Sequence, residues 1–281
     1  MKIKHKDTRW LLIWIIGSSA IWTWDALFLN KPALVKVVNG FANTFIIAVL
    51  VVGFTLVLGW VTTLVLHSLY SRLNRAAYFI VTFFLNLIRS VPQIVGILFA
   101  YVGVSLLVQN SIVTSKPLLF VIMAFCMSVF IFLELVDLMR DRIDHFMQLD
   151  FYSAMRVCGI PDSRIINFDI LWKNSRMHIQ NKLIAVFGYA VFLQCSVDFI
   201  ISVGLSTDVN DTSLPVTLGS LLAKIDSKQD ILAIGYTLTH WDYIGRLFFQ
   251  HLQGMTIAFL IVFTLVSVYH IANGYAERHR L

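Results

Sequence analysis

Residues 41–66 read FANTFIIAVLVVGFTLVLGWVTTLVL, a run without a single charged side chain. A helix of about 20 predominantly apolar residues crosses a hydrocarbon core of roughly 30 Å. This run is therefore long enough and apolar enough to form a membrane-spanning helix.

The composition of the whole chain agrees with that prediction. Of 281 residues, 58% are hydrophobic and 14% are charged, whereas soluble domains are about half apolar and about a quarter charged. The net charge of +6 is spread over short segments between apolar runs, which is typical of membrane topology rather than of nucleic-acid binding. We expect a lipid bilayer as the surroundings and no nucleic acid as a partner.

Further apolar stretches of spanning length lie on both sides of this run. The six predicted spans are 10–27, 41–66, 78–108, 117–138, 183–204 and 255–272. We therefore predict an all-α, polytopic membrane protein with six transmembrane helices in a single domain, residues 1–281. Residues 1–40 would hold the N-terminal tail, the first span and a short external loop, and residues 41–281 the core.

The distribution of basic residues orients these spans. Cytoplasmic segments carry an excess of Lys and Arg, and an N-terminus placed inside puts fifteen of the 22 Lys and Arg residues on that side. We predict that both termini are cytoplasmic. Two connections are long, residues 140–182 on the cytoplasmic side and residues 206–254 outside, and long ordered loops are usually functional.

The cytoplasmic loop contains DFYSAMRVCGIPDSRIINFDILWKNS, residues 150–175. We predict a short helix over 151–157, with Gly159 as its C-cap and Pro161 as its stop. A second helical stretch is expected over 162–171. Two short helices on the cytoplasmic side fit a docking surface, and the residues alone fit a solvated linker on the membrane equally well.

This loop resembles the EAA loop of ABC importer permeases, whose pattern is E-A-A, three residues, G, about ten residues, then I-L-P. Ala154 takes the first alanine position and Ser153 stands where the family has glutamate. Arg156 matches the arginine of the peptide-transporting form. Gly159 matches the glycine, and the pair Ile170–Leu171 matches Ile-Leu.

The resemblance extends from about residue 41 to the end and is closest to the dipeptide, oligopeptide and nickel permeases. The other similar segments are Arg72-Leu73, Arg89-Ser90-Val91-Pro92, DFIISVGL at 198–205, LPVTLGSLLA at 214–223 and IANG at 271–274.

The resemblance implies the fold and the partners of a type I ABC importer. A second homologous permease chain, two cytoplasmic ATPase subunits and an extracytoplasmic substrate-binding protein would join this chain in a bacterial inner membrane. Ser153, Ala154, Arg156, Gly159, Ile170 and Leu171 would form the coupling site for an ATPase. ATP and Mg would bind in the ATPases, because this chain has no phosphate-binding loop pattern.

Three residues inside predicted spans are candidates for the translocation pathway or its gate. Arg89 is costly there, at about 2.5–3.5 kcal/mol on insertion scales, so it either pairs with an acid of a neighbouring span or lines the pathway. Pro92 removes a backbone hydrogen bond and is expected to kink its helix. Asp198 would pair with a base, Arg89 among the options, or contact a cationic group of the substrate.

A second acidic pair, Glu134 and Asp137, lies three residues apart and so on one helix face. We expect it to form an interfacial network with Arg140 and Arg142. The eight histidines and three cysteines show no metal-ligand or disulfide spacing, so we predict no metal, no cofactor and no catalytic residue in this chain.

The first hypothesis is therefore a permease subunit of an ATP-driven ABC importer that moves peptides or similar small solutes. A secondary transporter that works without ATPases is the alternative from another class, since such folds carry acids within the membrane. A non-transporting membrane scaffold subunit is the third reading.

Overall fold

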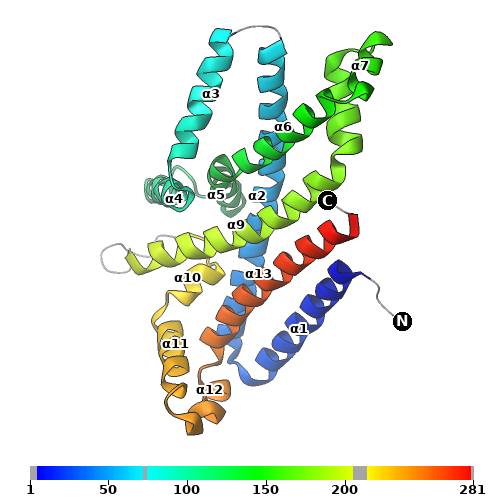
Figure 1. The fold of residues 1–281 in the computed structure, drawn as a ribbon. Helices are drawn as coiled ribbons and strands as arrows, with labels where there is room; N and C mark the ends of the chain where they lie inside the picture. The colour runs from blue at the N-terminus through cyan, green and yellow to red at the C-terminus, as the bar shows by residue number, and fades with distance from the viewer. Residues whose placement is uncertain (1–4, 72–74, 205–213, 280–281) are drawn as a thin grey trace.

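The computed structural model describes residues 5–71, 75–204 and 214–279, and within these ranges it contains helices and connections but no strand. Figure 1 shows long helices that cross one another rather than an upright bundle. The predicted motif residues Arg72, Leu73 and Leu205 lie outside the described ranges.

The helices follow one another with short connections. Their bounds are α1 Lys6–Phe28, α2 Lys31–Ser71, α3 Arg75–Ser90, α4 Gln93–Gln109, α5 Lys116–Ile131, α6 Leu133–Met147, α7 Asp150–Val157, α8 Asp162–Arg164, the π-helix η1 Ile165–Asn174, α9 Arg176–Gly204, α10 Leu218–Leu222, α11 Ile225–Thr237, the 3-10 helix η3 Trp241–Tyr243, α12 Ile244–Gln250 and α13 Leu252–His279.

Several of these helices are long and apolar enough to span a membrane. Four of them, α1, α2, α9 and α13, have this character as single helices. Two further spans are possible as bent pairs, α3 with α4 at 93° and α5 with α6 at 48°. The all-α prediction is confirmed, and the predicted six spans correspond to these four helices plus the two bent pairs.

The segment predicted as a short external loop before residue 41 is helical, and its external location stays a prediction. Helix α2 begins at Lys31, so only Leu29 and Asn30 separate it from α1. Proline suits the first turn of a helix, where its missing N–H has no partner to lose, and Pro32 occupies this place. Gly40 does not interrupt α2 because Leu221 of α10 packs where a side chain would stand.

Helix α1 packs along α13 at one edge of the molecule (Figure 1). Lys6 Nζ lies 2.7 Å from Glu277 Oε1, and Arg278 Nη1 lies 3.2 Å from Asp7 Oδ2. The start of α1 and the end of α13 therefore lie side by side, and the cytoplasmic location of both termini stays a prediction.

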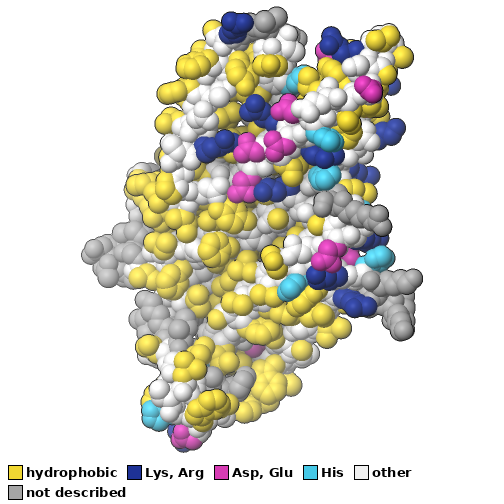
Figure 2. Space-filling model, viewed as in Figure 1, with side chains coloured by type: hydrophobic (Ala, Val, Ile, Leu, Met, Phe, Trp, Pro, Cys, Tyr) yellow, Lys and Arg dark blue, Asp and Glu magenta, His cyan; other side chains and the backbone are white. Residues whose placement is uncertain are grey.

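Charged side chains gather at the same end as the termini and α7. Figure 2 shows Lys, Arg, Asp, Glu and His over the upper and right-hand part of this face, and mostly hydrophobic side chains below it. The largest apolar core lies between α2, α4, α5, α9 and α10. A second core lies between α6, α7, η1 and the start of α9.

Candidate functional site

The two bent pairs meet close to their breaks. The first break is at Pro92, between α3 and α4, and the second is at Phe132, between α5 and α6. Arg89, just before the first break, donates to both carboxylate oxygens of Asp137 at 2.7 and 2.9 Å. Gln93, just after it, donates to Glu134 at 3.5 Å. Polar groups that flank one break therefore contact polar groups that follow the other.

Helix α9 completes this polar group. Lys182 Nζ donates to Glu134 Oε2 at 2.7 Å, and the Tyr189 hydroxyl donates to Gln93 Oε1. We call the six side chains the break cluster, formed by Arg89, Gln93, Glu134, Asp137, Lys182 and Tyr189. Two bases face two acids, so the cluster is formally neutral, and pairing lowers the cost of holding charges within apolar helices.

The two ion pairs differ in exposure. The side chains of Arg89 and Asp137 are 53% and 51% exposed, whereas those of Lys182 and Glu134 are 28% and 39% exposed. Helix α3, which carries Arg89, buries none of its residues in this chain. The Arg89 pair therefore lies on a side of the chain that is open to lipid, water or another protein.

The predicted pairing of Arg89 with an acid on a neighbouring span is confirmed, and its gating role stays a prediction. The expected network of Glu134 and Asp137 with the arginines of their own helix is wrong. Arg140 instead reaches the Tyr78 hydroxyl at 3.5 Å, and Arg142 lies 3.5 Å from Ser175 Oγ. The bend before α6 turns its acidic face toward α3 and α9, which supply the bases.

Asp198 lies elsewhere, so its suggested pairing with Arg89 is wrong. It is buried in α9 at 6% exposure, and its Oδ2 accepts a hydrogen bond from Thr217 Oγ1 at 2.6 Å. Thr217 is the N-cap of α10, and its Oγ1 accepts the Ser220 N–H at 3.2 Å. Asp198 thus holds the start of α10, while a contact with substrate stays a prediction.

Segment 214–222 is also tied to α2. Thr44 Oγ1 accepts the Leu218 N–H at 3.0 Å, and Asn43 Nδ2 donates to the Val216 carbonyl at 2.8 Å. A Cβ at Gly219 would overlap the backbone of Cys195, so α10 lies directly on α9. Sequence reasoning missed Thr217, although a threonine followed three residues later by a polar residue is a capping-box signal.

At the other end of the molecule, the helix and C-cap predicted for residues 151–159 are confirmed. Helix α7 covers Asp150–Val157, and Gly159 has a φ of +78°. The Gly159 N–H bonds to the Arg156 carbonyl at 2.9 Å, and the Ile160 N–H bonds to the Met155 carbonyl at 3.2 Å. These two bonds make a Schellman motif, for which glycine suits the left-handed position.

Helix α7 is braced against α8 by an ion pair and a hydrogen bond. Arg156 Nε lies 3.2 Å from Asp162 Oδ1, and the Tyr152 hydroxyl donates to the same oxygen at 3.2 Å. Burial and the negative charge of Asp162 raise the pKa of the Tyr152 hydroxyl above its usual value.

The predicted coupling residues divide into two groups. Ser153, Ala154, Arg156 and Gly159 are exposed on or beside α7. Ile170 and Leu171 are fully buried in the second core, with Leu135, Met139 and Ile143 of α6. The second helical stretch starts at Asp162 as predicted, and it continues as a π-helix to Asn174.

The candidate site therefore has an exposed helix, α7, and a partly exposed polar cluster, the break cluster. Within the described ranges, no group of three or more His, Cys, Asp or Glu residues could hold a metal ion. In comparisons with known proteins, no family model and no curated protein matches the sequence.

Proposed function

We propose that this chain is a permease subunit of an ATP-driven importer of the ABC type, which moves peptides or similar small solutes through a bacterial inner membrane. The observation that carries the proposal is helix α7. It is short and exposed, ends in a Schellman motif at Gly159, and rests on a buried stretch that packs against α6.

The packing around α7 supports a way to pass force into the membrane. Asp162 ties α7 to the start of the following stretch, and that stretch buries Ile170 and Leu171 against α6. The first turn of α6 holds Glu134, whose partner Lys182 lies on α9. A displacement of α7 by an ATPase would thus move α6 and change the distances within the ion pairs of the break cluster.

The partners in this proposal are two cytoplasmic ATPases, a second permease chain and an extracytoplasmic substrate-binding protein. The ATPases would contact α7. The second permease would cover the side of α3 that carries the half-exposed Arg89–Asp137 pair. The binding protein would face α10 to α12, of which α11 and α12 lie at the opposite end of the molecule from α7 (Figure 1).

The test is native mass spectrometry of the tagged chain, purified in gentle detergent from its own host. We expect a complex with a second permease and two ATPase chains. Val157 is 89% exposed at the end of α7, and Val157→Asp should remove the ATPases without straining the backbone. Gly159→Trp should do the same by distorting the cap.

A matched control is Gly235→Trp in α11. As at Gly159, no atom lies within 4 Å of an added Cβ, but the position lies at the opposite end of the molecule, so the ATPases should stay bound. The proposal is wrong if the chain purifies without any ATPase under conditions that preserve other ABC complexes from the same cells.

A secondary transporter is the second candidate, and the break cluster is the observation that favours it. Discontinuous helices with ionisable groups at their breaks are typical of ion-coupled transporters. The chain reconstituted alone in vesicles would then accumulate solute under a proton or sodium gradient without ATP. An ABC permease without its ATPases would show no such accumulation.

A further inference from the structure

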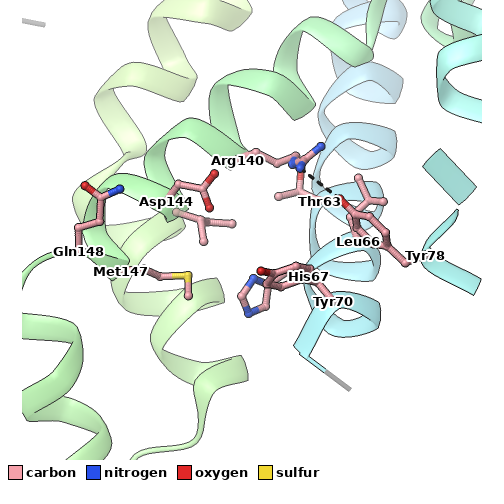
Figure 3. A pocket seen from close by; sticks show the side chains of 10 residues that line it. Thr63, Leu66, His67, Tyr70, Tyr78, Arg140, Asp144, Met147 and Gln148 are labelled. Atoms are coloured by element: carbon pink, nitrogen blue, oxygen red, sulfur yellow. Dashed lines mark hydrogen bonds between the residues drawn. The ribbon is translucent and has the colours of Figure 1, made fainter. Parts of the chain in front are cut away.

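A pocket of about 470 Å³ opens between α2, α3 and α6, and its lining residues are distinct from those of the break cluster and of α7. Figure 3 shows its side chains converging from the three helices. They are Thr63, Leu66, His67 and Tyr70 of α2, Tyr78 of α3 and Arg140, Ile143, Asp144 and Met147 of α6, followed by Gln148. Its volume falls within the range of about 300–1,000 Å³ that is usual for small-molecule sites.

The pocket presents one cation and one anion from the same helix face. Arg140 and Asp144 lie four residues apart on α6, and both line the cavity (Figure 3). The guanidinium of Arg140 donates to the Tyr78 hydroxyl at 3.5 Å. Within the described part of the chain, the Asp144 carboxylate makes no hydrogen bond or ion pair. A ligand that carries both charges would satisfy both groups.

The remaining polar groups surround these charges. His67 and Tyr70 face them from α2, and Gln148 follows at the end of α6. The Tyr78 and Tyr70 rings lie 6.0 Å apart. The Tyr78 hydroxyl lies beside Arg140, the Tyr70 hydroxyl lies next to His67, and the Gln148 amide lies on the side of Asp144 (Figure 3).

The pocket lies at a boundary between apolar and polar surface. The predicted apolar span 41–66 of α2 ends at Leu66, and the pocket extends past it to Tyr70. Tyrosines are enriched at the level of lipid headgroups. Below the pocket, α3 turns Phe79, at 71% exposure, and Phe83, at 55%, away from the chain, which provides a surface for acyl chains.

We propose that this pocket binds the headgroup of a zwitterionic aminophospholipid of the phosphatidylethanolamine type. Its phosphate would contact Arg140 and the Tyr78 hydroxyl, and its ammonium group would contact Asp144. The acyl chains would lie along the exposed apolar face of α3. An anionic headgroup without an amine fits less well, because Asp144 would face it without compensation. The proposal rests on the membrane location alone and is independent of ATP-driven transport.

The experiment is native mass spectrometry of the purified protein, with its partner chains if they are retained, in detergent with equal amounts of phosphatidylethanolamine and phosphatidylglycerol of the same chain length. We expect the wild type to retain phosphatidylethanolamine preferentially. Arg140→Gln should weaken retention of both lipids, and Asp144→Asn should abolish the preference. Each loss should be roughly fivefold, as for one charged hydrogen bond at a partly exposed site.

Charge-matched controls are Asp141→Asn on α6 and Arg164→Gln on α8, both exposed and outside the pocket. They should behave as the wild type does. Equal retention of the two lipids by the wild type, or equal behaviour of pocket and control variants, would overturn the proposal.

A soluble headgroup separates the lipid from a free phosphate ester. Glycerophosphoethanolamine, which lacks acyl chains, should not displace the lipid at millimolar concentration. Displacement at that concentration would mean that the pocket takes a soluble phosphoamine, and the assignment to a lipid would be wrong.

Discussion

The α3–α4 pair and the α5–α6 pair are both broken helices, but their breaks have different origins. The first turns by 93° at Pro92 and the second by 48° at Phe132. At the first break, the proline has no N–H, so the hydrogen-bond ladder is interrupted by covalent structure. At the second, the Phe132 N–H still reaches the Ser128 carbonyl at 2.9 Å, and its own carbonyl accepts the Leu135 and Val136 N–H groups.

Packing accounts for the second bend. Phe132 is 5% exposed in a cluster with Leu66, Leu133 and Val136, and Leu135 fills the space left by Gly59 of α2. Helix α5 packs on α2 and α4, while α6 packs on α2 and η1. The break at Pro92 is therefore caused locally by the proline, whereas the bend at Phe132 is held by packing against α2, α4 and η1.

The largest expected effect is on the break that depends on packing. Phe132→Ala removes a buried aromatic ring and should lower the free energy of unfolding by about 3–5 kcal/mol. Reversible unfolding in mixed micelles measures this loss. Phe84→Ala, at a 58% exposed position on α3, is the control and should change stability little. Equal losses for both variants would contradict the packing origin of the bend.

Gly96→Val should separate the two broken pairs. A Cβ at Gly96 would overlap the Phe130 ring, so α4 and α5 could no longer approach each other beside the two breaks. We expect a loss of about 1–3 kcal/mol from overpacking, measured in the same unfolding experiment. Gly103→Val on the same helix is the matched control, since nothing lies within 4 Å of a Cβ there. If Gly103→Val lowered the free energy of unfolding as much as Gly96→Val, the loss would come from the helix propensity of valine rather than from overpacking.

The two ion pairs of the break cluster should differ in strength. A double-mutant cycle of Lys182→Met with Glu134→Gln should give a coupling of about 1–2 kcal/mol, because this pair is the less exposed one. The cycle of Arg89→Met with Asp137→Asn should give at most about 1 kcal/mol in the isolated chain. A reversed order would show that the Arg89 pair is shielded from water, as it would be behind a second chain.

Pro92→Ala should have the smallest effect on stability, about 0.5 kcal/mol or less, while it changes geometry. Alanine restores an N–H that can pair with the Ile88 carbonyl, and alanine favours helix. We expect the angle between α3 and α4 to fall, as measured by the distance between spin labels at the exposed positions Phe79 and Phe99. An unchanged distance would mean that the first break is also held by packing.

Sequence reasoning reached those parts of the candidate site that depend on local chemistry. The cap at Gly159 is predictable because the signal is local: glycine tolerates the positive φ of a helix C-cap, and Pro161 follows two residues later. The break at Pro92 and the need of Arg89 for an acid followed in the same way. The partner of Arg89, the bend at Phe132 and the contact of Asp198 with Thr217 could not be predicted, because each joins segments that meet only after packing.

The sequence by itself determined the membrane class, the apolar helices and the positions where backbone hydrogen bonding fails. These follow from hydrophobicity and from residue-specific restrictions on the backbone, which act over a few residues. Only the tertiary structure decided which charges pair, which predicted coupling residues are buried and where a pocket remains between α2, α3 and α6. Those outcomes depend on shape complementarity and on electrostatic interactions between helices that are far apart in the chain. Such helices come together only when the chain packs, so neighbouring residues in the sequence do not reveal these contacts.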